Sequence, residues 1–360
     1  MRNRPGSRDP QVPCARQPVP IERALRSHAD LAGDKARPRG AGMRSRERFT
    51  DVGRPSRLAF GARWLVALSF ALAARSASPA WTSVDAGRGP VPVQVPDAPA
   101  PPAGYPLIVL LHGFGVTGVF EELYLQMSVP VSASGFLYAL PDGTLNPNGE
   151  RFWNATDACC DTFGSGVDDV GYLLDLLDAI DTLLGVDARR VFFLGHSNGA
   201  FMAYRMACSA ADRVTGSVSL AGATYYDPAD CQPARPVGIL HIHGTADARI
   251  LYAGGELLAP YPGAEQSVAA WASYDGCSEP PASGAPFDAE ATLPGDETAV
   301  STYAIGCRGP RVELWTILGG EHIPTFTATF RERLMGWFED ASSALFADGF
   351  ESGDLRAWGN

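Results

Sequence analysis

A serine between two glycines is the feature of this chain that most clearly suggests chemistry. Residues 191–200 read Val-Phe-Phe-Leu-Gly-His-Ser-Asn-Gly-Ala, and a helix-compatible run, 201–206, follows at once. A buried strand, a tight turn and a helix in this order would expose the hydroxyl of Ser197 on a sharp turn, as a serine nucleophile requires. Gly195 and Gly199 leave room for such a turn. We therefore predict a nucleophile at Ser197.

The predicted nucleophile needs a base, because a serine hydroxyl reacts poorly at neutral pH unless an imidazole takes its proton. Of the six histidines, His322 follows the last predicted strand in a Gly-rich loop. This is where the base falls in the chain order serine, acid, histidine. The other five lie in the leader, a strand-exit loop, the pentapeptide or a strand: His28, His112, His196, His241 and His243. We expect the last two to point into the core or brace a loop.

An acid must hold the imidazole, and backbone N–H groups must stabilise the developing oxyanion. Asp247 follows the predicted strand 237–243 by a short turn, and we prefer it to Asp227 and Asp230, which follow a different strand. The expected oxyanion donors are the N–H groups of Asn198 and Phe114, with Gly115 as an alternative to Phe114. The predicted triad is therefore Ser197, Asp247 and His322.

The segments that must position these residues alternate between strand-like and helix-like patterns. Apolar runs predict strands at 91–95, 106–111, 135–140, 191–194, 216–223, 237–243 and 312–318. Helical spacing predicts helices at 170–185, from about 198, at 265–274 and at 326–341, whereas 144–166 and 276–296 are expected to be loops. This order predicts one doubly wound, mostly parallel sheet with helices on both faces and a site at the carboxyl ends of its strands.

The N-terminal part differs sharply in charge from the rest. Residues 1–75 hold 16 of the 29 Lys and Arg but only 6 of the 40 Asp and Glu, which leaves a net charge of about −21 beyond them. We therefore expect no nucleic-acid partner. The 11-residue apolar run 64–74, with arginines before it and small residues after it, predicts a signal peptide cleaved after Ser76 or Ala80. An uncleaved anchor is the alternative, although the run is short for a membrane span.

These observations divide the chain into three parts. Residues 1–80 are expected to be a leader and signal peptide, with Met43 as an alternative start; 81–341 a single catalytic domain; and 342–360 a short acidic tail. The tail resembles the Asp-Gly-Phe-Glu-Ser-Gly endings of exported bacterial proteins, so it is either a sorting signal or a frayed end. We expect a secreted protein, extracellular or periplasmic, that is a monomer and has no stable membrane span after signal cleavage.

Export makes an even number of cysteines meaningful. Apart from Cys14, six remain, which suits three disulfides in an oxidising compartment: Cys159, Cys160, Cys208, Cys231, Cys277 and Cys307. Pairing Cys277 with Cys307 would tie down a loop rich in Pro, Gly and acidic residues, whereas the pairing of the other four is not readable from the sequence. Metal binding is the weaker hypothesis, because no Cys-x-x-Cys motif or histidine cluster accompanies them. We predict neither a metal nor a cofactor.

Taken together, the motifs resemble those of secreted α/β-hydrolases that include polyhydroxybutyrate depolymerases and feruloyl and acetylxylan-type carbohydrate esterases. The resemblance covers residues 90–340 and rests on motifs at 110–115, 141–143, 153–155 with 159–160, 168–171, 195–199, 243–247, 277 with 307, and 319–322. It implies that the segment around Trp153 belongs to the wall of the substrate cleft, although a plain packing role is the alternative. Glu321 stands where the family usually has a third glycine, and Ile323 and Pro324 follow His322 without the usual tryptophan.

The expected function is that of a secreted serine carboxylic ester hydrolase that resembles polyhydroxybutyrate depolymerases. Feruloyl or acetylxylan esterase activity is the alternative, so the expected substrate is a polyester or an acylated polysaccharide. Glu321, next to the base, is expected to raise the pKa of His322. A non-catalytic surface or binding protein on a hydrolase scaffold is the alternative of another class, and a peptidase is disfavoured because no gating domain precedes the predicted hydrolase.

Overall fold

The computed structural model describes residues 80–278 and 280–350, which fall in one of the two units of the chain. The predicted leader and signal peptide before residue 80, Cys14, His28 and Met43 among them, lie outside the described residues, as do the last ten residues of the predicted tail. Within the described part, no helix is both long enough and apolar enough to cross a membrane.

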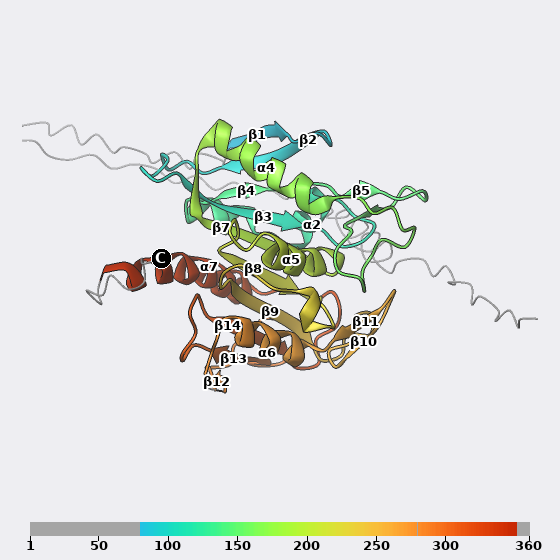
Figure 1. Ribbon diagram of the computed structural model, residues 1–360. Coiled ribbons are helices and arrows are strands. Elements are labelled where there is room, and N and C mark those ends of the chain that lie inside the picture. Colours follow the sequence, from blue (N-terminus) through green and yellow to red (C-terminus); the bar gives the residue numbers. More distant parts are fainter. Residues whose placement is uncertain (1–79, 279, 351–360) are drawn as a thin grey trace, which may run out of the picture. The chain divides into compact units, whose positions relative to one another are not determined.

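The described unit is built on a ten-stranded sheet in the order β1-β2-β4-β3-β7-β8-β9-β14-β13-β12 (Figure 1). Six central strands run parallel: β4 (Leu137–Ala139), β3 (Tyr105–Leu111), β7 (Val186–His196), β8 (Gly216–Leu220), β9 (Gly238–Gly244) and β14 (Val312–Ile317). Antiparallel strands extend both edges: β1 (Ala80–Asp85), β2 (Pro90–Val95), β13 (Thr298–Tyr303) and β12 (Ala282–Ser283). The mostly parallel, doubly wound sheet predicted from the sequence is confirmed.

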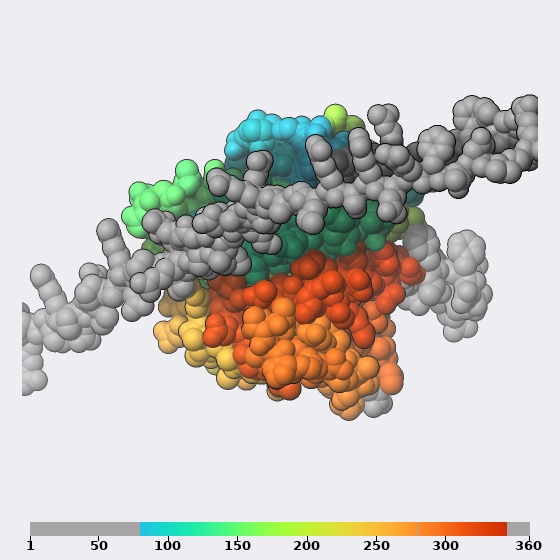
Figure 2. All heavy atoms as spheres, turned by 180° about the vertical axis from the view of Figure 1, so that it is seen from behind, coloured from blue at the N-terminus to red at the C-terminus, as the bar shows by residue number. Residues whose placement is uncertain are grey.

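Helices cover both faces of this sheet, and β3 shows how its residues serve each face. Leu107, Val109 and Leu111 pack in the cluster that contains α4 (Asp169–Leu184), α5 (Asn198–Ser209) and α6 (Ala264–Tyr274). Ile108 and Leu110 pack in the cluster that contains α2 (Gly118–Leu125), α3 (Ser128–Ala133) and α7 (Ala328–Phe350). The first set of helices lies in front of the sheet in Figure 1, and the red α7 lies on the face seen in Figure 2.

Small elements complete the strand-exit side of the unit. Two short hairpins, β5 (Thr144–Leu145) with β6 (Arg151–Phe152) and β10 (Gly254–Glu256) with β11 (Pro260–Pro262), follow β4 and β9 in the chain. The 3-10 helix η1 (Pro228–Asp230) follows β8. These elements lengthen the loops that follow the parallel strands, where the predicted site residues lie.

Some predicted boundaries differ from the structure. The segment 276–296 was expected to be an irregular loop, but β12 lies within it and β13 follows it, and the two extend the sheet beyond β14. The segment 144–166 was expected to be a loop, but it contains the hairpin of β5 and β6. The last helix was expected to end at Ala341, but it continues to Phe350. The strand β13 escaped prediction because most of its side chains are only half-buried, so that no continuous apolar run marks it.

Candidate active site

Ser197 lies on a strained turn between β7 and α5. Its backbone has φ 54° and ψ −119°, a conformation that residues with a side chain rarely adopt and that typically costs about 1–3 kcal/mol. A Cβ atom added at Gly195 would lie 2.0 Å from the carbonyl oxygen of Gly199, and one at Gly199 would lie 2.0 Å from that of Leu111. Both positions therefore require glycine, which is the physical reason for the pattern around the serine.

A hydrogen-bonded chain joins the three side chains that the sequence placed on separate strand exits. Nε2 of His322 lies 3.0 Å from Oγ of Ser197, and Nδ1 of His322 lies 2.7 Å from Oδ2 of Asp247. The backbone N–H groups of Arg249 and Ile250 donate to the other carboxylate oxygen of Asp247, at 2.8 and 2.9 Å. With Nδ1–H donated to a carboxylate, Nε2 is free to accept the serine proton.

The alternative acids lie elsewhere. Asp227 and Asp230 are exposed, and the carboxylate of Asp227 accepts a hydrogen bond from the N–H of Ala229 in η1. Only Asp247, among these three candidates, contacts His322.

Burial and nearby charges set the pKa values of His322 and Asp247. Burial lowers the pKa of His322 below its ordinary 6.5, although the hydrogen bond to Asp247 opposes the shift. Burial alone would raise the pKa of Asp247, but hydrogen bonds from His243 and His322 outweigh it, so this pKa lies below its ordinary value. The expectation that Glu321 raises the pKa of His322 is wrong, because the Glu321 side chain is exposed and the pKa of His322 is lowered.

In the loop after β3, the backbone N–H of Phe114 is free to donate, whereas its two glycine neighbours are occupied. The N–H of Gly113 donates to Oε2 of Glu121 at 2.9 Å, and that of Gly115 donates to the carbonyl of Arg151 at 2.8 Å. Gly115 is therefore occupied and does not replace Phe114 as a donor. Within the described residues, the N–H groups of Phe114 and Asn198 donate to no protein acceptor. These are the two groups that the sequence predicted as oxyanion donors.

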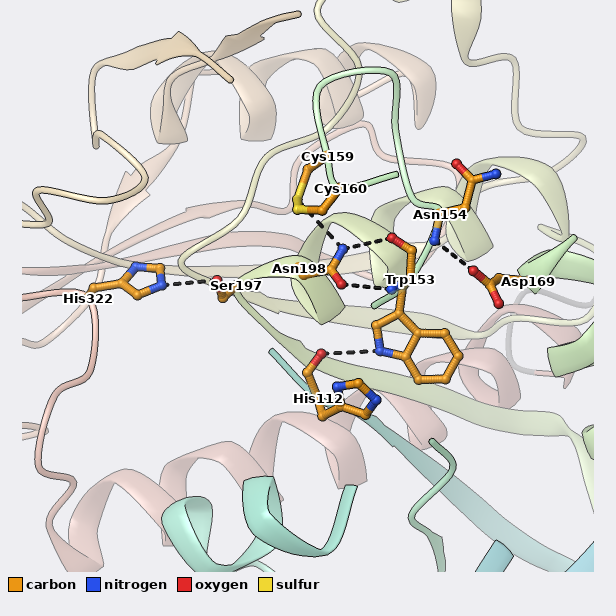
Figure 3. Close-up of a disulfide and its surroundings, with 9 residues drawn as sticks. All are labelled: His112, Trp153, Asn154, Cys159, Cys160, Asp169, Ser197, Asn198 and His322. Atoms are coloured by element: carbon orange, nitrogen blue, oxygen red, sulfur yellow. Dashed lines mark hydrogen bonds between the residues drawn. A yellow bond between two sulfur atoms is a disulfide. The ribbon is translucent and has the colours of Figure 1, made fainter. Parts of the chain in front are cut away.

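The side chain of Asn198 ties the start of α5 to the segment around Trp153 (Figure 3). Its Oδ1 accepts from the backbone N–H of Trp153 at 2.7 Å, and its Nδ2 donates to the carbonyl of Trp153 at 2.9 Å. Nδ2 also lies 3.6 Å from Sγ of Cys159. Because the side chain is fixed at three points, the backbone N–H of the same residue is held next to Ser197.

Trp153 was expected in the wall of the substrate cleft, but its indole is completely buried, with 0% of its surface exposed. Its Nε1–H donates to the carbonyl of His112 at 3.1 Å, and its ring lies 5.1 Å from the imidazole of His112 and 6.4 Å from the ring of Tyr172. The indole therefore packs against His112 and holds the start of the loop after β3, which is the packing role that the sequence left open.

The six cysteines of the described unit form three disulfides. Cys277 pairs with Cys307, as expected from the sequence, and the pairs that the sequence did not resolve are Cys159 with Cys160 and Cys208 with Cys231. In the described segments, no cluster of three or more His, Cys, Asp or Glu side chains is arranged to hold a metal ion.

Behind Asp247, a row of buried side chains forms a hydrogen-bonded chain that the sequence did not predict. Oη of Tyr204 lies 2.8 Å from Nδ1 of His241, and Nε2 of His241 lies 3.0 Å from Nδ1 of His243. Nε2 of His243 lies 2.8 Å from the carbonyl oxygen of Ile250 and 3.3 Å from Oδ2 of Asp247. The two histidines thus brace the loop that carries the acid, as their position on a buried strand suggested.

A second group that sequence reasoning missed lies behind His322. Nδ1 of His196 lies 2.9 Å from Oε1 of Glu121, and Nε2 of His196 lies 3.1 Å from the carbonyl oxygen of His322. Glu121 and its neighbour Glu122 are identical in type, and nothing in the sequence marks the first as the buried partner of a histidine. The position of His196 within the pentapeptide was the only available signal.

The sheet order, the helices on both faces and the serine on the β7–α5 turn define an α/β-hydrolase fold. Residues 97–274, which carry Ser197 and Asp247, match the family model described as phospholipase/carboxylesterase.

Similar proteins have esterase names. Feruloyl esterase B of Piromyces equi is 28% identical over 226 residues, which cover 60% of this chain and 39% of that protein. The bifunctional acetylxylan esterase/xylanase XynS20E of Neocallimastix patriciarum is 25% identical over 147 residues, which cover 41% of this chain and 20% of that protein. The chain therefore spans well under two thirds of the length of these relatives.

A solved structure shows the same fold. The acetyl xylan esterase from Aspergillus awamori superimposes with a TM-score of 0.50 at 15% sequence identity, and the match covers 72% of this chain and 99% of that one. At this identity the similarity concerns the fold and not the substrate.

Proposed function

We propose that this protein is a serine carboxylic ester hydrolase that works through an acyl-enzyme. The observation that carries the proposal is the continuous hydrogen-bonded chain from Ser197 through His322 to Asp247. The free N–H groups of Phe114, in the loop after β3, and of Asn198, at the start of α5, support it, as does the match of residues 97–274 to a carboxylesterase family model.

In the proposed reaction, Nε2 of His322 accepts the proton of Ser197 while Oγ attacks the ester carbonyl carbon. The oxyanion of the tetrahedral intermediate accepts hydrogen bonds from the N–H groups of Phe114 and Asn198. His322 then returns the proton to the leaving alcohol, and the acyl group stays on Oγ. A water molecule, deprotonated by the same imidazole, attacks the acyl-enzyme and releases the acid, while Asp247 keeps the imidazole in the required tautomer.

Acylated polysaccharides are the substrate class that the comparisons favour. The names of two similar proteins include feruloyl esterase and acetylxylan esterase, so a feruloyl or acetyl ester of a plant polysaccharide is the first substrate to test.

A polyester of the polyhydroxybutyrate type is a second candidate, which the sequence motifs favour. Large apolar side chains are exposed on the segments that follow β3, β8, β9 and β14, and they would suit a hydrophobic polymer: Phe114, Val119, Phe120, Leu123, Tyr226, Leu251, Leu257, Leu258, Leu318 and Ile323.

The two substrate candidates predict different results. The polysaccharide ester predicts release of ferulate or acetate from decorated xylan, without clearing of a polyhydroxybutyrate suspension. The opposite pair of results would favour the polyester.

The reaction class is tested by replacing the nucleophile. Ser197→Ala should lower the hydrolysis of p-nitrophenyl acetate and butyrate by at least about 10⁴-fold, because the covalent step is lost. Circular dichroism should show an unchanged fold. A variant that keeps wild-type activity would overturn the assignment of Ser197.

A non-catalytic binding protein on the same scaffold makes a different prediction. A fluorophosphonate probe should label the wild-type protein and not Ser197→Ala, whereas an inert scaffold would remain unlabelled in both cases.

We also propose that the protein is exported and acts as a monomer. The three disulfides support export, because such bonds persist mainly in oxidising compartments. Fractionation of expressing cells and the mass of the purified protein by light scattering test the two statements.

A further inference from the structure

Glu121 is a buried carboxylate that contacts two of the loops around Ser197. It lies in the first turn of α2, and only 2% of its surface is exposed. One oxygen accepts the N–H of Gly113, the residue before the proposed oxyanion donor Phe114. The other lies 2.9 Å from Nδ1 of His196, the residue before the nucleophile. Through His196, the contact extends to the carbonyl oxygen of His322.

The partners of His196 determine its charge. Nδ1 faces a carboxylate oxygen and Nε2 faces a backbone carbonyl oxygen, and both of these are acceptors that have no proton to give. A neutral imidazole carries only one N–H, so it would turn a lone pair of one ring nitrogen toward an acceptor oxygen. Only the imidazolium, with a proton on each nitrogen, presents a positively charged N–H to both acceptors.

Burial makes this charge depend on Glu121. Burial alone lowers the pKa of His196, but the charge of Glu121 and the hydrogen bond to it outweigh burial and raise this pKa above 6.5. In return, His196 holds the pKa of the Glu121 carboxyl below its ordinary value, against the effect of burial. Two opposite charges in a site closed to water stabilise each other, whereas removal of either would leave the other uncompensated.

We propose that the Glu121–His196 ion pair is a positioning element for ester hydrolysis by Ser197, and this inference rests on the function proposed above. The pair fixes the backbone of His322 on one side and the loop that carries Phe114 on the other. It therefore sets the geometry of both the base and the oxyanion donor, although neither side chain takes part in the reaction.

The pair also has an electrostatic effect on the base. The ring centroids of His196 and His322 lie 5.2 Å apart, so the positive end of the pair opposes protonation of His322. The other charged or titratable groups that face these two rings are Asp247, Arg249, Glu121 and Tyr124. His322 is thereby kept in the neutral form that accepts the serine proton.

The substitution Glu121→Gln removes the negative charge of the side chain and keeps its size and shape. The amide oxygen can still accept the N–H of Gly113, and the amide NH₂ must then donate to Nδ1 of His196, which makes that imidazole neutral. Its Nε2–H still donates to the carbonyl of His322, so every contact is kept and only the charge pair is lost. Glu121→Ala removes the contacts as well.

The matched control is Glu122→Gln. Glu122 is adjacent in α2 and accepts from the N–H groups of Met127 and Ser128 and from the hydroxyl of Tyr138, but it has no contact with the loops around Ser197. A variant at this position reports the general effect of neutralising a carboxylate in α2.

The test measures kcat and KM for p-nitrophenyl butyrate from about pH 4.5 to 8.5, the range in which a histidine base titrates. We expect Glu121→Gln to lower kcat about tenfold with little change in KM and to move the acid limb of kcat/KM to higher pH, because His322 loses the nearby positive charge. We expect Glu121→Ala to lower kcat about 100-fold, comparable to the loss of one oxyanion donor. Glu122→Gln should keep the wild-type acid limb.

An unshifted acid limb in Glu121→Gln, or the same kinetic change in Glu122→Gln, would overturn the inference. Failure of the proposed function itself has a different signature, since the wild-type protein would then neither hydrolyse the ester nor react with a fluorophosphonate. If Glu121→Ala does not fold, Glu121→Gln still decides the matter, because its contacts are preserved.

Discussion

His196 and His243 both support the row of side chains from Ser197 to Asp247, yet from their partners we infer different charges for them. His196 has acceptors at both nitrogens, the carboxylate of Glu121 and the carbonyl of His322, and we infer that it is an imidazolium. His243 has acceptors only at Nε2, while its Nδ1 faces Nε2 of His241. Both rings are buried, so burial alone does not decide whether a histidine is charged.

We infer that the rings of His241 and His243 are neutral, which gives the row of side chains behind Asp247 one direction. In this assignment the hydroxyl of Tyr204 donates to His241, Nε2–H of His241 donates to His243, and Nε2–H of His243 points toward the carbonyl of Ile250 and the carboxylate of Asp247. Burial lowers the pKa of His241 well below its ordinary value, as a neutral ring requires. The acid of the proposed triad is thus supported by dipoles, and the base by an ion pair.

The largest loss of stability should come from interrupting the hydrogen-bonded row Tyr204–His241–His243 at His243, next to Asp247. His243→Leu leaves the carbonyl of Ile250 and the Nε2–H of His241 without partners and removes a donor from Asp247. We expect the free energy of unfolding to fall by about 3 kcal/mol, since each buried unsatisfied group costs about 1–3 kcal/mol. Urea denaturation at neutral pH measures the loss. A change smaller than that of an exposed-site variant would show that the chain contributes no stability.

The two groups should also differ in the pH dependence of the stability they provide. The pKa of His196 is raised, so its stabilisation is complete below pH 6.5 and is lost as the pH rises through the raised value. The pKa of His241 is lowered, so its contribution is present above 6.5 and is lost as the pH falls. Glu121→Gln should therefore destabilise more at about pH 5.5 than at about pH 8.5, and His241→Leu should do the reverse. Urea denaturation at both pH values checks this, and the same trend in both variants would contradict opposite charge states.

The smallest effect should come from the far end of the neutral chain. Tyr204→Phe removes only the donor to Nδ1 of His241, and we expect a loss of about 1 kcal/mol with esterase activity within about twofold of wild type. Tyr252→Phe is the control, since its ring packs on His243 but its hydroxyl contacts Thr316 and Glu265 instead of the histidines. If thermal denaturation shows the same loss of stability in both variants, the hydrogen bond from Tyr204 to His241 contributes no more than the loss of a hydroxyl group elsewhere.

Sequence patterns predicted the parts of the molecule that depend on local composition. The apolar run of β3 and the glycines around Ser197 were sufficient, because a buried parallel strand and a sharp turn each restrict the residue types allowed. Edge strand β1 was missed, since five of its six side chains are exposed or half-buried and no apolar run identifies it. The same reasoning placed Ser197, Asp247 and His322 at separate strand exits, which the structure brings within hydrogen-bonding distance.

Supporting residues could not be predicted in this way, because their partners are far apart in the chain. Glu121 and His196 are 75 residues apart, and Tyr204 and His241 are 37 apart. Trp153 shows the converse problem: an aromatic residue in a motif near the site was expected to touch substrate, but the fold buries it completely. Residue type and motif position indicate proximity to a site, whereas burial and hydrogen-bond partners determine the role.

The charge difference between His196 and the pair His241 and His243 can be measured directly. NMR of protein labelled with ¹⁵N-histidine, at about pH 7.5 where a free imidazole is mostly neutral, distinguishes an imidazolium from either neutral tautomer. We predict that His196 carries protons on both ring nitrogens, that His241 and His243 carry one on Nε2 alone, and that Glu121→Gln converts only His196 to the neutral form. A neutral His196 in the wild-type protein at this pH would contradict the account.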